Sequence, residues 1–308
     1  MKEKNSIRVL QATVCNDKGG LTGYICQNYN FIDKDKIQFD FITYDKVLDF
    51  EEDFKKKGAD FYRSPKPQNI FKYYKFWRKL QRKNKYKIVH FHMAYTNIIP
   101  IIFAKLVGIE NIILHAHSTQ IDDNRLVIRV IKENLNSIGK ILVKFLVKKY
   151  LACSDLAAKW MFPKEVVREK KYILAHNAIN LNRYLFSKKI RKEKRKELQI
   201  PDDCFCIGHV GRFTYQKNHE FLIDIFKEIH SLNINTKLLL IGSGPLVDKI
   251  KEKVINSNLE KDVIFLGNRK DVFNLYSIMD CFVLPSLFEG LPIVGIEAQA
   301  ASLPCFFF

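Results

Sequence analysis

Two glutamates near the end of the sequence stand in a segment that is otherwise apolar. The stretch Phe288-Glu289-Gly290-Leu291-Pro292 follows a buried-strand pattern, and Glu297 lies eight residues after Glu289. A carboxylate is costly to bury without a partner, and a strand-to-helix turn lies at the ligand-binding edge of a parallel sheet. We predict that Glu289 lies at such an edge and that Glu297 can reach a ribose. The alternative is a surface glutamate at a turn and a second one on a helix face.

A loop with two cations precedes these acids in the sequence. Residues 211–217 read GRFTYQK and lie between a strand pattern and a helix pattern. Such a loop can direct Arg212 and Lys217 at the two phosphates of a nucleotide diphosphate. The alternative is that these two cations have no role in ligand binding, because an arginine at a strand end with a lysine nearby is common.

Two glycine turns offer further contact with a ligand. Gly19 and Gly20 follow the first strand pattern, where glycine allows close backbone approach and the next helix offers its N-terminus to an anion. Gly242-Ser243-Gly244 follows another strand pattern but lacks the third glycine of the dinucleotide fingerprint. A strand-to-helix turn with no ligand explains this second motif equally well.

The elements that position these residues form two similar series. Strand patterns of the first series lie at 7–14, 39–43, 87–92, 112–117 and 150–154, and those of the second at 206–210, 237–241, 263–266 and 281–284. Helical patterns separate most of them, which favours parallel sheets covered on both faces. We predict an α/β protein with two Rossmann-like domains, 1–185 and 186–308, joined near the charge run that begins at Lys188.

Positive charge is concentrated in the first part of the chain. Residues 1–200 carry 41 lysines and arginines against 20 acids, whereas residues 201–308 carry 10 against 13. This asymmetry predicts an anionic partner for the first part, either a membrane surface, a phosphorylated lipid or a nucleic acid. We exclude nucleic acid, because no recognition-module signature is present. An ordinary lysine-rich surface is the remaining alternative.

Two basic helical stretches carry much of this charge. In residues 71–86, Tyr73, Phe76, Trp77 and Leu80 share one helical face. In residues 137–150, lysines 140, 144 and 148 form a stripe beside apolar residues. A basic amphipathic helix can lie on anionic lipid, or it can pack its apolar face on a sheet. Both readings stay open for both stretches.

The remaining composition indicates a cytoplasmic protein. No apolar run reaches the roughly 20 residues of a membrane span, and the N-terminus lacks an apolar signal-peptide segment. The seven scattered cysteines show no metal-ligand spacing, so we expect buried free thiols. We expect the protein in the cytoplasm, with peripheral binding to the inner face of the membrane.

Taken together, these motifs resemble family 4 of the glycosyltransferases, in particular bacterial enzymes of capsular and exopolysaccharide synthesis. The resemblance runs from Ile7 to about Cys305. Its markers are Gly19-Gly20, residues 150–154, 176–180, 208–213, 216–218, 263–267 and 284–286, and the pair Glu289 and Glu297. The resemblance implies the GT-B fold, in which two Rossmann-like parallel-sheet domains face a cleft. The family also implies a UDP- or GDP-linked sugar as donor and a lipid-linked glycan as acceptor.

The resemblance also implies roles for individual residues on the donor side. Arg212 and Lys217 would hold the donor diphosphate and stabilise the leaving group. Glu289 would contact the sugar, with the Gly290 and Leu291 amides near the sugar or phosphate. Glu297 would bind the ribose hydroxyls, and residues 267–269 would lie near the base.

Further roles fall to the first domain. Gly19 and Gly20 would face the diphosphate, and His117 matches the family's active-site histidine, with His115 close enough to compete for that assignment. Such enzymes retain anomeric configuration and need no metal or other cofactor, because cationic side chains stabilise the leaving diphosphate.

The sequence departs from the family pattern in two places. Ser302 stands where glycine is usual, and the sequence ends at Phe306-Phe307-Phe308, where family members continue. We expect a C-terminally truncated chain whose second domain is incomplete. The alternative function is therefore a catalytically inactive remnant that acts as a binding partner of a membrane synthase.

Overall fold

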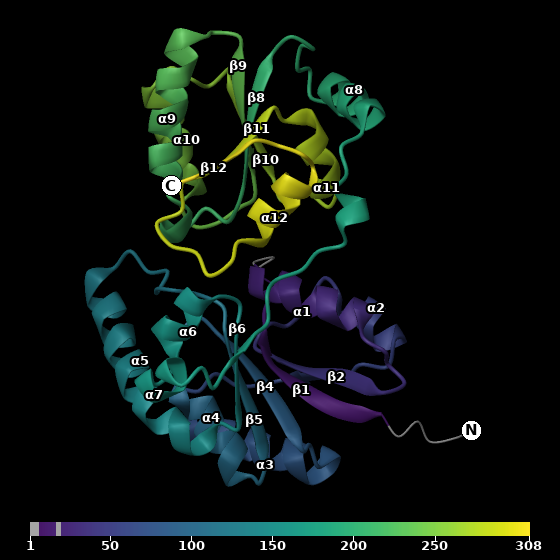
Figure 1. Cartoon of the computed structure of the whole chain (residues 1–308), viewed down its shortest axis with the longest axis vertical. Helices are drawn as coiled ribbons and strands as arrows, with labels where there is room; N and C mark the ends of the chain where they lie inside the picture. The colour runs from purple at the N-terminus through teal and green to yellow at the C-terminus, as the bar shows by residue number, and fades with distance from the viewer. Residues whose placement is uncertain (1–5, 17–19) are drawn as a thin grey trace. The chain divides into compact units, whose positions relative to one another are not determined.

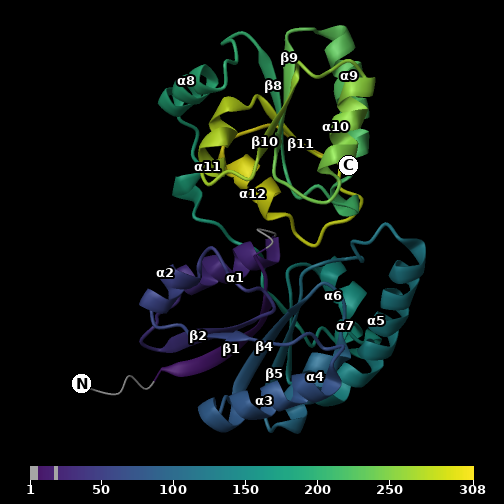
Figure 2. The same ribbon diagram turned by 180° about the vertical axis from the view of Figure 1, so that it is seen from behind.

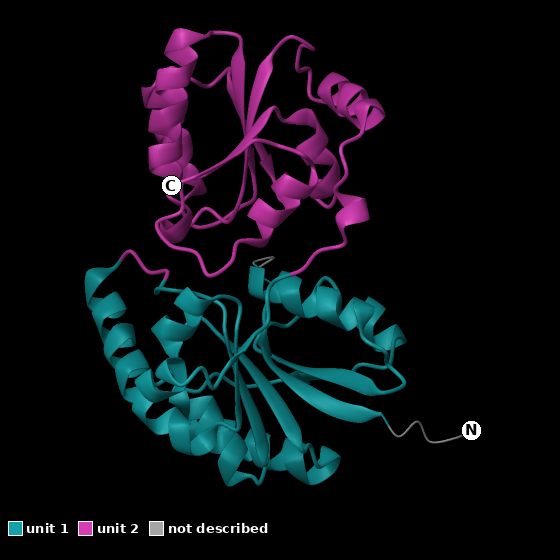
Figure 3. Ribbon diagram, viewed as in Figure 1, with its two compact units in different colours: residues 1–121, 125–177 teal, residues 122–124, 178–308 magenta. Residues whose placement is uncertain are grey.

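The computed structural model describes residues 6–16 and 20–308, which form two compact units (Figure 3). Unit 1 comprises residues up to 121 together with 125–177, and unit 2 comprises 122–124 together with 178–308. In each unit, strands alternate with helices and every strand pair is parallel (Figure 1). The predicted α/β class is confirmed.

Unit 1 contains a sheet of seven strands. Its strands are β1 (Ile7–Val14), β2 (Ile37–Thr43), β3 (Phe61–Arg63), β4 (Ile88–Met93), β5 (Asn111–Ala116), β6 (Lys149–Ala152) and β7 (Ile173–Leu174). Its helices are α1 (Gly20–Phe31), α2 (Glu51–Lys56), α3 (Ile70–Asn84), α4 (Ile98–Leu106), α5 (Leu126–Leu146), α6 (Asp155–Met161) and α7 (Lys164–Arg168). The strand order is β3-β2-β1-β4-β5-β6-β7, so the direction of winding reverses between β1 and β4.

Helices cover both faces of this sheet, as alternation of side chains along a strand requires. On β4, the His92 ring faces Tyr24 of α1, with 6.0 Å between ring centroids. The neighbouring Phe91 points the other way and meets Trp77 of α3, with centroids 6.1 Å apart. Helices α1 and α3 therefore lie on opposite faces, as Figures 1 and 2 show from two sides.

Unit 2 contains a sheet of five strands. They are β8 (Phe205–Val210), β9 (Thr236–Ile241), β10 (Val263–Gly267), β11 (Cys281–Leu284) and β12 (Cys305–Phe307). The helices are α8 (Lys188–Glu197), α9 (His219–Leu232), α10 (Val247–Asn256), α11 (Val272–Leu275) and α12 (Ile293–Ala300), with 3₁₀ turns at Leu181–Arg183, Tyr215–Lys217 and Tyr276–Ile278. The strand order is β10-β9-β8-β11-β12, and winding reverses between β8 and β11.

The core of unit 2 lies on both faces of its sheet. One cluster joins the sheet to α9 and α10 through Leu222, Phe226, Ile250 and Val254. The other covers the opposite face and includes Tyr276. On α9, Ile223 also packs in this core, whereas Phe221 is 43% exposed.

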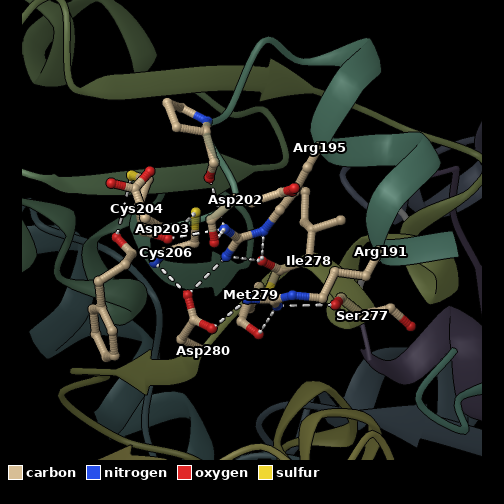
Figure 4. Close-up of polar contacts among 12 residues, drawn as sticks. Arg191, Arg195, Asp202, Asp203, Cys204, Cys206, Ser277, Ile278, Met279 and Asp280 are labelled. Carbon is tan, nitrogen blue, oxygen red and sulfur yellow. Dashed lines mark hydrogen bonds and ion pairs between the residues drawn. The ribbon is translucent and has the colours of Figure 1, made fainter. Parts of the chain in front are cut away.

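The charge run at the start of unit 2 forms helix α8, which is fastened to the sheet by two arginines (Figure 4). Arg195 is 1% exposed, and its guanidinium donates to the carbonyls of Pro201, Asp202, Cys204 and Ile278. Its Nη2 also pairs with Asp280 Oδ2 at 2.8 Å, while Arg191 Nη2 pairs with Oδ1 at 2.6 Å. The Cys206 amide donates to the same Asp280 carboxylate at 2.7 Å. The five guanidinium donors are thus satisfied inside the fold.

Candidate functional site

The predicted donor-side residues lie at the carboxyl edge of the sheet in unit 2. Arg212 and Lys217 follow β8, and Glu289 follows β11. These two strands are neighbours in the sheet, and they flank the point where winding reverses. In open α/β sheets, ligands bind at this point, outside the carboxyl ends of the strands.

The structure brings Lys217 and Glu289 into direct contact. Lys217 Nζ lies 2.6 Å from Glu289 Oε1, and the two side chains are 14% and 21% exposed. Gln216 Nε2 donates to the Phe288 carbonyl at 2.9 Å, and the Leu287 amide donates to the Gln216 carbonyl at 2.8 Å. Gln216 Nε2 also lies 3.3 Å from Glu289 Oε2. These contacts join the loop after β8 to the loop after β11 and place a cation and a carboxylate side by side at the edge.

A pocket of about 390 Å³ lies beside Glu289. It is lined by residues of the β11–α12 turn, of α12 and of the C-terminal strand, among them Glu289, Leu291, Pro292, Gly295, Gln299 and Phe307. Such a pocket has the size of a small-molecule site. Arg212 is exposed on the loop after β8, and Gly290 is half-buried at the entrance to α12.

Glu297 lies on α12 between two tyrosines. Tyr184 Oη donates to Glu297 Oε1 and Tyr276 Oη donates to Oε2, each at 2.7 Å. Burial raises the pKa of the Glu297 carboxyl, while the two hydroxyl donors oppose this shift. Each carboxylate oxygen keeps a second lone pair, so the predicted contact with a ribose remains compatible with both tyrosines.

The glycines of the turn after β9 have a structural purpose. Gly242 has φ of +136°, and a Cβ there would lie 2.1 Å from the Gly211 carbonyl oxygen. A Cβ on Gly244 would lie 2.6 Å from the Phe213 carbonyl oxygen. The Phe213 amide donates to the Ser243 carbonyl at 3.0 Å. The two turns pack backbone against backbone, which fixes the loop that carries Arg212.

Unit 1 gathers four histidines on one face of its sheet. His90 and His92 alternate along β4, and His115 and His117 follow the same alternation on β5 and just beyond it. His92 Nδ1 lies 2.9 Å from His117 Nε2, and His92 Nε2 lies 2.7 Å from Gln11 Oε1. A chain of polar contacts therefore runs from β1 through β4 to His117.

His117 differs from His115 in its access to ligands. His115 is 0% exposed, and its Nδ1 lies 3.3 Å from His90 Nε2. His117 is half-buried at the end of its strand. Removal from water, aided by His90, lowers the pKa of His117 to about 3. Of the two, His117 is the more accessible to a ligand, and its lowered pKa favours the neutral imidazole.

Three of these histidines could together hold a metal ion. One ring nitrogen each from His90, His92 and His115 lies within 4.8 Å of the others, and imidazole nitrogen suits zinc and similar ions. Both His92 nitrogens already lie within hydrogen-bonding distance of Gln11 and His117, so a metal bound there would displace one of these contacts. The expectation that no metal is needed stays a prediction.

The first glycine turn is described only in part. Gly20 opens α1, is exposed, and would have open space around an added Cβ. Gly19 lies outside the described residues. The predicted role of both glycines beside a diphosphate stays a prediction.

Comparison with known proteins identifies the family. Residues 190–308 match the family model described as "Glycosyl transferases group 1". The chain is 30% identical to EpsF of Bacillus subtilis, named as a glycosyltransferase, over 97% of this chain and 78% of that protein. The chain belongs to the group 1 glycosyl transferases. This confirms the resemblance predicted from the motifs.

One further relative and one solved structure extend the comparison. One is the UDP-Gal:alpha-D-GlcNAc-diphosphoundecaprenol alpha-1,3-galactosyltransferase of Escherichia coli, 30% identical over 74% of this chain and 59% of that protein. The other is the solved structure of Anabaena HepE in complex with UDP and glucose. It aligns with a TM-score of 0.77 at 16% identity, over 97% of this chain and 80% of that one. This likeness shows the fold and confirms the GT-B class.

Sequence reasoning missed the residues that support the site. Tyr184 and Tyr276 are distant from Glu297 in the sequence. Gln11 is 1% exposed in the middle of β1. A buried polar residue in a strand pattern is the one signal that points to Gln11. The tyrosines gave no comparable signal.

Proposed function

We propose that this glycosyltransferase moves a sugar from a nucleotide-sugar donor to a lipid-linked or polysaccharide-precursor acceptor in surface polysaccharide synthesis. The observation that carries the proposal is the Lys217–Glu289 pair at the sheet edge of unit 2, where winding reverses. It provides a cation for a diphosphate and a carboxylate for sugar hydroxyls within one site. The names of the relatives support this choice: a galactosyltransferase acting on a diphosphoundecaprenol acceptor, and CapM of capsular polysaccharide biosynthesis in Staphylococcus aureus.

On the donor side, Arg212 and Lys217 bind the diphosphate of a UDP- or GDP-linked sugar. Their charge stabilises the leaving diphosphate as the glycosidic bond to it breaks. Glu289 binds the sugar beside the Gly290 and Leu291 amides, and Glu297 binds the ribose. The solved complex of HepE with UDP and glucose supports UDP as the first donor base to test.

The reaction keeps the anomeric configuration of the donor sugar and requires no metal. Histidine 117, held as a neutral imidazole by burial, contacts the reacting sugar rather than neutralising the diphosphate. Gly19 and Gly20 lie near the diphosphate. Transfer in the presence of excess EDTA, and NMR of the product's anomeric proton, check these two statements.

The enzyme works in the cytoplasm, at the inner face of the membrane where lipid-linked acceptors are found. No helix among the described residues has both the length and the hydropathy of a membrane span. The net charge of +18 supports association with an anionic surface.

Calorimetric titration with UDP and GDP tests the donor site. We expect Lys217→Ala to weaken binding of the preferred nucleotide by about 10- to 100-fold, because a hydrogen bond to a charged group contributes about 1.5–3 kcal/mol. Lys227→Ala, at an exposed lysine of α9, is the matched control and should bind as the unaltered protein does. Equal binding by both variants, or no binding of either nucleotide by the unaltered protein, would count against the proposal.

Transfer assays then separate the two functional alternatives. With labelled UDP-sugars and a diphosphate-lipid-linked acceptor, we expect product from the unaltered protein and a loss of about 100-fold or more in Glu289→Gln. Nucleotide binding without any transfer would instead favour a catalytically inactive binding partner of a membrane synthase.

A further inference from the structure

Three histidines of unit 1 approach one another from two neighbouring strands. His90 and His92 lie on one face of β4, because alternate residues of a strand point the same way. His115 lies on β5, directly opposite His92 in the register of the two strands. Each ring offers a nitrogen that lies within 4.8 Å of the other two. Three histidines are a donor set that holds zinc and leaves its fourth position open to water.

The spacing of the ring nitrogens fits such an ion. His90 Nε2 and His115 Nδ1 lie 3.3 Å apart, and two nitrogens bound to one tetrahedral zinc at about 2.0–2.1 Å are themselves about 3.3–3.4 Å apart. His115 Nε2 is buried and has no hydrogen-bond partner among the residues that the structure describes. A buried polar atom without a partner is costly, so His115 has unused bonding capacity that a metal ion can take up.

Gln11 holds His92 in the orientation of a metal ligand. The side-chain oxygen of Gln11 lies 2.7 Å from His92 Nε2. Because a carbonyl oxygen only accepts hydrogen bonds, Nε2 carries the proton and the lone pair of the neutral ring is on Nδ1. Metal-binding histidines usually donate their other N–H to a carbonyl or carboxylate in this way. Gln11 therefore presents His92 Nδ1 to an ion.

The three rings are in the protonation state that a metal requires. Burial lowers the pKa of His90 to about 3 and also lowers the pKa values of His92 and His115. The rings are therefore neutral at physiological pH, and neutral imidazole is the form that binds metal. Imidazole nitrogens favour zinc and similar ions, whereas magnesium and calcium prefer oxygen ligands.

We propose that His90, His92 and His115 bind one Zn²⁺ ion, which is no cofactor of sugar transfer but blocks it. His92 Nδ1 lies 2.9 Å from His117 Nε2, so an ion on Nδ1 takes away the partner that orients His117. The ion also brings positive charge next to that ring. The block rests on the proposed function, in which His117 contacts the reacting sugar, whereas zinc binding does not depend on it.

Metal titration of the nucleotide-free protein tests the site. We expect calorimetry with ZnCl₂ to show one ion per chain, and CoCl₂ to give the visible absorption of a tetrahedral cobalt site, which zinc then removes. His115→Gln and His90→Gln should each weaken zinc binding by at least about 100-fold, since loss of a supporting partner alone costs about 10- to 100-fold. The matched control is His230→Gln, at a half-buried histidine of α9 in unit 2, which should bind zinc unchanged.

Two changes at Gln11 test its part in the site. Gln11→Leu removes the acceptor of the His92 proton and should weaken zinc binding by about tenfold. Gln11→Glu keeps an acceptor and should bind zinc at least as tightly as the unaltered protein. A role of Gln11 in packing alone predicts the opposite order, because a buried carboxylate disturbs a fold more than leucine does.

Two results would overturn the zinc site. One is the absence of saturable zinc binding by the unaltered protein. The other is equal binding by the unaltered protein and by both histidine variants, which would place the ion elsewhere. Circular dichroism verifies that the variants are folded, and the half-buried His90 keeps the test valid if the change at His115 unfolds unit 1.

Transfer assays test the block separately. We expect zinc to abolish sugar transfer and EDTA to restore it, and transfer that continues with zinc bound would overturn the block. The metal titrations contain no nucleotide and no acceptor. A failure of the proposed function would therefore leave the zinc result interpretable.

Discussion

Helices α3 and α5 are built from the same kinds of residue, yet they meet the rest of unit 1 with opposite sides. Both are rich in lysine, arginine and large apolar side chains. Helix α3 buries Tyr73, Trp77 and Leu80 against the sheet, whereas α5 buries Asn136 and Gly139 and turns Phe145 outward. The apolar face of α3 belongs to the core, and that of α5 does not.

The difference lies in what the neighbouring elements offer to each helix. Trp77 finds the ring of Phe91 on β4, so the sheet provides an apolar surface for α3. Helix α5 instead meets the loop at Thr96, whose backbone groups require a small residue and a hydrogen-bond acceptor. Amphipathicity shows that a helix has two sides, but the neighbours decide which side faces inward.

The largest expected effect comes from removing the anchor of α3. We expect Trp77→Ala to reduce the free energy of unfolding of unit 1 by about 3–5 kcal/mol, because a large buried aromatic leaves a cavity. The matched change Phe145→Ala on α5 should lie within about 0.5 kcal/mol of the unaltered protein. Urea unfolding followed by circular dichroism checks both. Similar losses in the two variants would show that the apolar side of α5 is packed after all.

A smaller effect is expected from the polar contact of α5. Asn136→Leu removes the acceptor of the buried Thr96 amide, and an unsatisfied buried donor costs about 1–3 kcal/mol. The exposed Asn134→Leu on the same helix serves as control and should leave the urea midpoint nearly unchanged. If Asn136→Leu instead stabilised unit 1, the hydrogen bond between Asn136 and the Thr96 amide would not be what orients α5.

The close approach at Gly139 is expected to contribute less. In Gly139→Ala, the Cβ meets the Thr96 carbonyl oxygen at 2.6 Å, and overpacking costs about 1–3 kcal/mol. The higher helix propensity of alanine offsets about 1 kcal/mol of this, so we expect a net loss of about 1 kcal/mol. Ser137→Ala, two residues earlier on the helix and exposed, is the control. A gain in stability from Gly139→Ala would contradict the close approach of Gly139 to the Thr96 backbone.

The smallest expected effect concerns the charges of α3. The triple variant Lys72→Gln, Lys75→Gln, Lys79→Gln removes three exposed lysines from α3. It should weaken binding to vesicles with equal parts of phosphatidylcholine and phosphatidylglycerol by less than about threefold. The corresponding triple change at Lys144, Lys148 and Lys149 should weaken it by at least about tenfold, since each basic residue near the membrane contributes about 1 kcal/mol. Equal effects would mean that the net charge of unit 1, rather than α5, sets the affinity.

Much of the fold could be predicted because it depends on local patterns. Runs such as Leu238 to Leu240 are apolar and short, and turns follow them, so both sheets were apparent. The short strands β3, β7 and β12 were missed, because two or three residues carry no periodicity. The orientation of α5 could not be predicted, because it depends on Thr96, a residue 40 positions from Asn136.

The candidate site also has one part that the sequence predicts and one part that it does not. Lys217 and Glu289 were singled out because each follows a strand pattern, and the structure places them in contact. The partners of Glu297 come from Tyr184, 113 residues away, and Tyr276. Their pairing depends on how the 3₁₀ turns pack on α12, which no local pattern encodes.

The contact between Lys217 and Glu289 has a consequence for selectivity among anions. With its charge matched by a carboxylate at 2.6 Å, Lys217 offers little net attraction to a passing inorganic phosphate. If the two residues bind as proposed, a nucleotide sugar replaces this ion pair at both ends, with its diphosphate on Lys217 and its sugar hydroxyls on Glu289, whereas UDP or GDP alone replaces it only at Lys217. On that proposal, the ion pair favours a nucleotide sugar over an inorganic phosphate or a free sugar.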